Sequence, residues 1–113
     1  MERPPLLILL SGAAGTGKSS LARALGERLG LAVIDKDDVK DLIYTYFTDT
    51  NVSGALSYEV MWKMAETQLA LGHGVICDSP LSGRQAMERV FKAVKKHSAA
   101  LYVVHCYISD RRE

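Results

Sequence analysis

The glycine-rich segment from Gly12 to Ser19 constrains this chain more than any other stretch. It reads Gly-Ala-Ala-Gly-Thr-Gly-Lys-Ser and matches the phosphate-binding template G-x-x-x-x-G-K-[ST] at every fixed position. An apolar run at 6–10 precedes it and a helical pattern follows it, which is the setting that the template requires. Glycines let backbone N–H groups surround an anion, and the N-terminus of the following helix adds a positive dipole end. The expected phosphate-binding residues are Gly12, Ala13, Ala14, Gly15, Thr16, Gly17, Lys18, Ser19 and Ser20.

Two side chains of this segment carry chemistry. Lys18 can place its ammonium group on the β- and γ-phosphates of a nucleotide, and the Ser19 hydroxyl can ligate Mg²⁺. The expected ligands are therefore ATP and Mg²⁺. The alternative interpretation is a glycine-rich turn beside a surface lysine, and the flanking strand and helix argue against it.

Length and composition indicate one globular domain. The chain has 113 residues, 48% of them hydrophobic and 24% charged, which argues against disorder. A net charge of +1 provides no basic stripe, so we expect no binding to duplex nucleic acid. No apolar run approaches the ~20 residues of a membrane span, so we expect no membrane partner. Cys77 and Cys106 fall in predicted buried strands as free thiols, which favours a cytoplasmic protein.

Strand and helix patterns alternate along the chain. This alternation predicts βαβ units, right-handed crossovers and a mostly parallel sheet. A polar, turn-like stretch is expected at 48–54, and Ser82 is expected to cap the last complete helix. A further helix begins at 109–113 as the chain stops, so we expect a single domain, 1–113, that is incomplete at its C-terminus. We expect strands at 6–11, 31–34, 75–77 and 101–108, and helices at 17–29, 42–47, 56–71 and from 83 onward.

Aspartates follow the second and third expected strands. Open α/β sheets bind ligands at the carboxyl ends of their strands, where the phosphate loop also lies. Asp35 and Asp37 are two residues apart, so a strand that extended through both would point them to one side, one toward a Mg²⁺-bound water and the other toward an acceptor hydroxyl. Asp78 stands where a Walker-B-like aspartate would stand. The expected metal ligands are therefore Ser19, Asp35 and Asp78.

These aspartates also have structural interpretations. Asp37 or Asp38 can cap the next helix, and Asp78 can be a turn residue before Pro80.

Asp38, Lys40 and Arg84 are candidate substrate contacts. The lysine and the arginine, like Lys36, more often lie on a solvated surface.

Together these motifs resemble the small P-loop kinases. Gluconate and shikimate kinases, chloramphenicol phosphotransferase, zeta toxins and polynucleotide 5′-kinases belong to this group, often labelled AAA-domain ATP-binding proteins. The resemblance extends over 6–113 and implies a three-layer P-loop NTPase fold, with the strand order 2-3-1-4. In that order the first strand separates Cys77 from Cys106 by about 10 Å, so we expect no disulfide.

The resemblance also implies roles. Asp37 matches the carboxylate that activates the acceptor hydroxyl, and Lys18 is the other expected catalytic residue. Lys40 stands where polynucleotide kinases have an arginine, which argues against that substrate class. The family's fifth strand and arginine-bearing lid are missing, so we expect weak or absent catalysis by these residues alone and self-association through the exposed edge of strand four.

The leading hypothesis is an ATP-dependent phosphotransferase that moves the γ-phosphoryl group to a hydroxyl of a small molecule or nucleotide. A non-catalytic nucleotide-binding module or truncated isoform is the alternative. A regulatory GTPase is less favoured because the sequence has no N-K-x-D guanine motif.

Overall fold

The computed structural model contains a four-stranded parallel sheet flanked by helices. It describes residues 3–12, 16–47, 50–78 and 83–107. The strands lie in the order β2-β3-β1-β4, which confirms the expected α/β P-loop fold. The strands are β1 (Leu6–Gly12), β2 (Ala32–Asp35), β3 (Val75–Asp78) and β4 (Ala100–Cys106). The helices are α1 (Lys18–Leu29), α2 (Lys36–Tyr46), α3 (Thr50–Ala70) and α4 (Gly83–His97).

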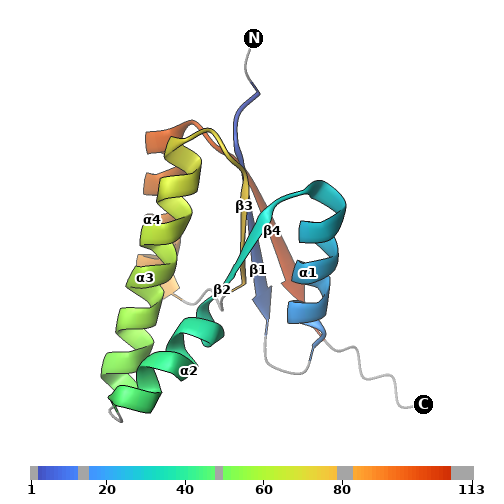
Figure 1. The fold of residues 1–113 in the computed structure, drawn as a ribbon. Helices are drawn as coiled ribbons and strands as arrows, with labels where there is room; N and C mark the ends of the chain where they lie inside the picture. Colours follow the sequence, from blue (N-terminus) through green and yellow to red (C-terminus); the bar gives the residue numbers. More distant parts are fainter. Residues whose placement is uncertain (1–2, 13–15, 48–49, 79–82, 108–113) are drawn as a thin grey trace, which may run out of the picture.

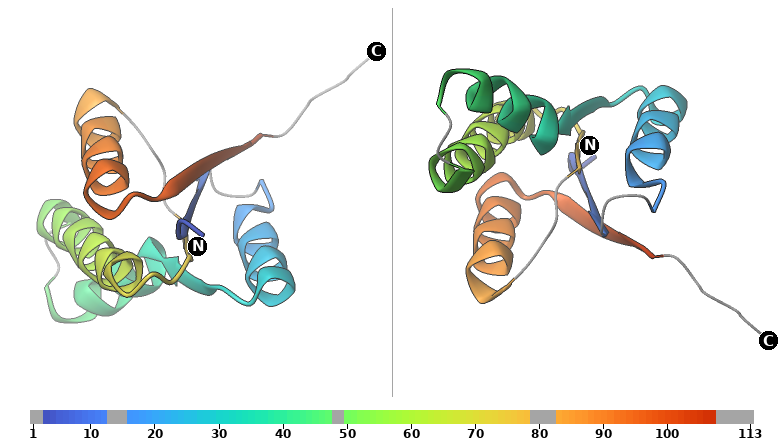
Figure 2. Two further views of the ribbon diagram at one scale, coloured as in Figure 1. Left: turned by 90° about the horizontal axis from the view of Figure 1, so that it is seen from above. Right: turned by 90° about the horizontal axis from the view of Figure 1, so that it is seen from below.

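The central strand β1 is covered on both faces. Helix α1 lies on one side of the sheet and α3 and α4 lie on the other (Figures 1 and 2). Leu7 and Leu9 pack into the cluster that contains Trp62 of α3, whereas Ile8 and Leu10 pack toward α1. Side chains alternate between the two faces of a strand, so a doubly covered strand needs apolar residues at every position. The unbroken apolar run before the phosphate loop follows from this arrangement.

Helix α1 packs through its small residues. Leucines recur every four residues along this helix, from Leu21 to Leu29, which predicts a leucine packing face. Leu21 and Leu29 are nevertheless exposed, whereas Ala22 and Gly26 are buried against the sheet. A Cβ at Gly26 would come within 2.6 Å of Val33 Cγ2. Close approach of the helix to the sheet therefore selects alanine and glycine, and the leucines remain at the margins.

Helix α2 begins earlier than expected. Strand β2 ends at Asp35, and the Asp35 carboxylate caps α2 by accepting a hydrogen bond from the Asp37 backbone N–H at 2.9 Å. The prediction that Asp37 or Asp38 is the cap is therefore wrong. Because the helix starts at Lys36, the strand does not extend through Asp37, and the condition under which Asp35 and Asp37 would share one side of it is not met.

Helix α3 also begins earlier, at Thr50, so most of the turn-like stretch expected at 48–54 is helical. Polar residues near the start of α3 belong to its packing face, since Ser53 and Ser57 are both fully buried. The Ser57 hydroxyl donates a hydrogen bond to the Gly54 carbonyl oxygen, which lets a serine be buried inside a helix.

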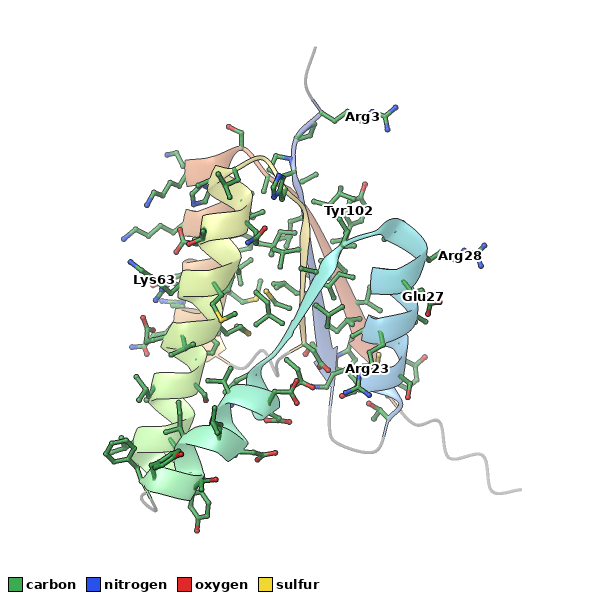
Figure 3. All side chains as sticks on the ribbon, viewed as in Figure 1. Arg3, Arg23, Glu27, Arg28, Lys63 and Tyr102 are labelled. Carbon is green, nitrogen blue, oxygen red and sulfur yellow. The ribbon has the colours of Figure 1, made fainter. Side chains whose placement is uncertain are left out.

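Strand β4 lies at the edge of the sheet. It was expected to be buried, but Tyr102 is 58% exposed and Val103 is 48% exposed, because among the described residues only β1 pairs with it. Tyr102 stands on the α1 side of the sheet, in register with Ile8 (Figure 3). Self-association through this edge stays a prediction.

The two cysteines are free, as expected. Cys77 is fully buried in β3, and this burial raises the pKa of its thiol to about 12, so it packs as a neutral hydrophobe. Cys106 is only half-buried, in the edge strand. Strand β1 lies between the two cysteine-bearing strands.

Some expectations concern residues outside the described ranges. These are the cap at Ser82, the end of strand four at Ile108, the helix start at 109–113 and the loop residues at 13–15. Among the described helices, none is long and apolar enough to cross a bilayer.

Candidate functional site

The described ends of the glycine-rich loop have the backbone geometry of a phosphate cradle. Gly12 ends β1 at φ 142°, and a Cβ at this position would overlap the carbonyl oxygen of Cys106. Gly17 precedes α1 at φ 81°, and among the described residues no side chain caps this helix. The first N–H groups of α1 can therefore take an anion.

Three side chains meet at the start of α1. The Lys18 Nζ lies 2.9 Å from Asp78 Oδ1, and the Ser19 hydroxyl donates a hydrogen bond of 2.9 Å to Asp78 Oδ2. The carboxylate is 2% exposed and the lysine side chain 9% exposed. Ser19 and Asp78 are 59 residues apart in the sequence. Strand pairing joins them, because β3 lies beside β1 with Asp78 in register with Leu10.

Asp35 lies next to this cluster. It ends β2 in register with Asp78 on β3, so the two carboxylates occupy neighbouring strand ends. Burial raises the pKa of Asp35, and the negative charges of Asp78, Asp38 and Asp37 raise it further, against the opposing effect of the hydrogen bond from the Asp37 N–H. The sheet thus gathers carboxylates from two strands beside the phosphate loop.

The donor set formed by Ser19, Asp35 and Asp78 suits Mg²⁺. This ion prefers oxygen ligands and keeps several of its waters, so it needs only one or two protein carboxylates. Among the described residues no group of three or more His, Cys, Asp or Glu side chains could enclose a metal, which is consistent with such an open site. The buried Asp78 Oδ1 has an ion pair with Lys18 but accepts no aligned hydrogen bond within the described part of the chain. This oxygen therefore retains capacity for a cation.

Asp35→Asn is expected to stabilise the folded chain at pH 7. A raised carboxyl pKa means that the favourable contribution of Asp35 is complete below about pH 3.8, its ordinary pKa, and is lost as the pH rises through the higher folded-state value. The amide removes the unfavourable buried charge and keeps an oxygen to accept the Asp37 N–H. Urea unfolding at a series of pH values measures the effect, which should disappear in acid.

The matched control is Asp41→Asn, at an exposed position on the same helix, which should change stability little. Equal effects of the two substitutions at pH 7 would contradict the inference that the partly buried charge of Asp35 is unfavourable.

The other predicted site residues do not belong to the cluster of Lys18, Ser19 and Asp78. Asp37 and Asp38 are exposed in the first turn of α2, and Lys40 is half-buried one turn later. Arg84 is exposed near the start of α4, and Ser20 is exposed in α1. Among the described residues, no ion pair involves any of these side chains. Their functional assignments stay predictions.

A groove opens beside the site, and no sequence motif indicated it. It has a volume of about 680 Å³ and lies between the start of α2, the first half of α3 and α4. Its wall includes Lys36, Tyr58, Glu59, Arg89 and Lys92. No sequence signal indicates this set of residues, because three helices contribute to it and no fixed spacing relates them.

The family assignment rests on nearly the whole chain and not on the phosphate loop alone. A sequence model of the family described as "AAA domain" matches residues 7–112. The chain belongs to this AAA-domain family. Uncharacterized proteins of Mycobacterium tuberculosis and Mycobacterium bovis are 34% identical to it over 84 residues, which covers 64% of this chain. The chain spans only 17% of the length of these relatives.

Solved structures share the fold of this AAA-domain chain. A Chloroflexus aurantiacus protein described as a candidate kinase has a TM-score of 0.85 at 24% identity, over 92% of this chain and 60% of its own. The Mycobacterium tuberculosis APS kinase, solved with AMPPNP and APS, has a TM-score of 0.71 at 18% identity, over 92% and 63% of the two chains. A gluconokinase from Sinorhizobium meliloti has a TM-score of 0.62 at 20% identity, over 96% and 61%. These likenesses show that the chain has the P-loop NTPase α/β fold.

Proposed function

We propose that this chain binds ATP with Mg²⁺ at the phosphate loop and transfers the γ-phosphoryl group to a hydroxyl of a small molecule or nucleotide. The cluster formed by the buried Lys18 and Asp78 with the exposed Ser19 carries the proposal. It combines a cation, a hydroxyl and a carboxylate at the N-terminus of α1, and such groups hold the phosphates and the metal in phosphoryl transfer.

The chain's own residues divide the work. Lys18 is paired with Asp78, and its ammonium is the proposed contact of the β- and γ-phosphates. Ser19, Asp78 and Asp35 are the residues that would hold Mg²⁺. That ion supplies charge neutralisation on the phosphate oxygens when bound. Asp35 also fixes the start of α2 through its cap, and so positions the first turn that carries Asp37.

Asp37 is the proposed acceptor of the hydroxyl proton. In the reaction a bond forms between the acceptor oxygen and the γ-phosphorus, and the bond from that phosphorus to the β–γ bridging oxygen breaks. ADP leaves with the electron pair of the broken bond, and the hydroxyl proton goes to the Asp37 carboxylate. The exposed position of Asp37 in the first turn of α2 leaves it accessible to an incoming hydroxyl.

A nucleotide-binding module without transfer is the second candidate. Lys18, Ser19 and Asp78 contact one another, whereas among the described residues the Asp37 side chain has no hydrogen-bond partner. This difference supports binding more strongly than it supports chemistry. We also propose a cytoplasmic location, in keeping with the two free thiols.

ATP with Mg²⁺ is expected to raise the melting temperature, and ATP with EDTA is expected to raise it less. At a nucleotide concentration 100 times the Kd, binding stabilises a protein by about 2.7 kcal/mol. Lys18→Met should abolish this shift. If millimolar ATP did not raise the melting temperature of the unsubstituted chain, the proposed binding site would be disproved.

Asp37→Asn separates the two candidates. This variant should keep the nucleotide-dependent shift in melting temperature. It should abolish the transfer of radiolabelled γ-phosphate from ATP to mixtures of hydroxyl-bearing acceptors. Full transfer by the variant would remove Asp37 as the base. No transfer by the unsubstituted chain, with binding intact, would favour the non-catalytic module.

A further inference from the structure

The groove between α2, α3 and α4 lies beside the proposed reaction centre. Its lining begins at Lys36, which directly follows Asp35, and Asp35 is in register with Asp78. Its volume of about 680 Å³ lies within the range of small-molecule sites. The wall opposite the start of α2 comes from α3 and α4, on the face of the sheet away from α1 (Figure 1).

The charges that line the groove are unevenly compensated. Arg89 is neutralised, because its Nη1 donates to both carboxylate oxygens of Glu59 at 3.0 Å. Lys36 and Lys92 have no carboxylate within ion-pair distance among the described residues, and Glu88 is exposed. Lys36 is half-buried, whereas Lys92 is exposed like Glu88. Among the described residues the groove therefore has two lysines and one glutamate without an ion-pair partner, an excess of one positive charge over the neutralised Arg89–Glu59 pair.

The α3 wall also contains hydrogen-bond donors without acceptors. Tyr58 lines the groove, and its hydroxyl is buried in the wall without a hydrogen-bond partner among the described residues. Trp62, one turn farther along α3, lies behind the wall: it is fully buried and does not line the groove, and within the described part of the chain its Nε1 has no partner. The two rings meet edge to face with centroids 6.3 Å apart, and the Arg89 guanidinium lies 5.8 Å from the Trp62 ring centroid. A buried donor without an acceptor is unfavourable, and an acceptor oxygen from a ligand would relieve this.

We infer that this groove binds the phosphoryl acceptor through an anionic group, a carboxylate or a phosphate, held by Lys36 and Lys92 with a hydrogen bond from Tyr58. The acceptor class is then a hydroxy acid or a sugar or polyol phosphate rather than a neutral alcohol. The assignment of this anion as the phosphoryl acceptor rests on the proposed function. The capture of the anion by the groove does not.

Trp62 provides a direct readout, because it is the chain's single tryptophan and contacts two groove residues. Its fluorescence is followed while anions and their neutral counterparts are added, with and without AMPPNP and Mg²⁺ to fill the phosphate loop. One pair is glycerol 3-phosphate and glycerol, and the other is gluconate and sorbitol. At least one anion should give a saturable change that its neutral counterpart does not give, and the responding pair distinguishes phosphate from carboxylate.

Substitutions locate the response. Lys92→Met and Lys36→Met should each weaken anion binding by about tenfold, as expected for loss of a charge-assisted contact. Tyr58→Phe should weaken it by a smaller factor. Lys95→Met, at an exposed position of α4 that does not line the groove, is the matched control and should bind like the unsubstituted chain.

A gain of binding tests the same charge balance. Glu59→Gln removes the carboxylate that neutralises Arg89, so it should tighten anion binding severalfold. This variant keeps the test decisive even if the lysine variants are less stable.

The outcomes distinguish this inference from the proposed function. Lys18→Met should remove the nucleotide response and keep the anion response, whereas Lys92→Met should do the reverse. Equal responses to both members of each pair, an absence of saturable change, or unchanged affinity in both groove-lysine variants would overturn the inference and leave the ATP site intact.

Discussion

Asp78→Asn is expected to lower the free energy of unfolding by about 3–5 kcal/mol, the cost typical of removing one partner from a buried ion pair. Asp78 and Lys18 are both buried, and their charged atoms lie 2.9 Å apart. Loss of the carboxylate charge leaves the Lys18 ammonium without a counter-ion in a site largely closed to water. The hydroxyl of Ser19 can still donate to the amide oxygen, so the loss measures the ion pair more than the hydrogen bond. Chemical denaturation without nucleotide measures this change.

A double-substituted chain is the control for the ion pair. Lys18→Met alone should also destabilise, because it leaves Asp78 buried without its cation, and the double variant should lose less than the sum of the two single losses. Saturating ATP should partly restore Asp78→Asn, since the phosphates give Lys18 a new partner. Strict additivity of the two single effects would show that the contact contributes little to stability.

Gly12→Ala is expected to destabilise the chain by about 3 kcal/mol or more, through backbone strain and overpacking together. At φ 142° an L-residue is strained, and the added Cβ would overlap the Cys106 carbonyl oxygen. This atom belongs to the backbone of the neighbouring strand β4 and cannot rotate away. The substitution must therefore separate β1 from β4 at the end that begins the phosphate loop, and nucleotide binding should weaken as well.

Gly30→Ala separates the two causes. Gly30 also has a positive φ, 67°, but a Cβ there would meet no atom within 4 Å. Gly30→Ala should lower the free energy of unfolding by about 1 kcal/mol, from backbone strain alone. Urea unfolding of both variants measures the difference, and equal losses would mean that the contact with Cys106 is relieved at no cost.

The strand–loop–helix unit was predictable because its signals are local. Residues 6–10 form a continuous apolar run, and the fixed glycines, Lys18 and Ser19 follow at set spacings. The alternation of strand and helix patterns, with the resemblance to small P-loop kinases, was enough to predict the sheet order that the structure shows. These features depend on residues close in the sequence or on a topology shared by a whole fold class.

The aspartates and helix faces were less predictable. Whether Asp35 continues a strand or caps a helix depends on where β2 stops pairing with β3, and this is set by the length of the neighbouring strand. The burial of Ala22 rather than Leu21 depends on how closely α1 approaches the sheet. Periodicity indicates which residues share a helix face. It does not indicate how near the next layer lies.

The sequence by itself determined a phosphate-binding loop between a buried strand and a helix, since glycine placement and one lysine are local requirements of an anion cradle. Only the tertiary structure decided what surrounds that loop. It placed Asp78 against Lys18 and Ser19 and set Asp35 beside them. It also formed the groove that contains Lys36 and Lys92 from three helices. The physical reason is that strand pairing and helix packing join residues far apart in the sequence, at distances that no spacing along the chain encodes.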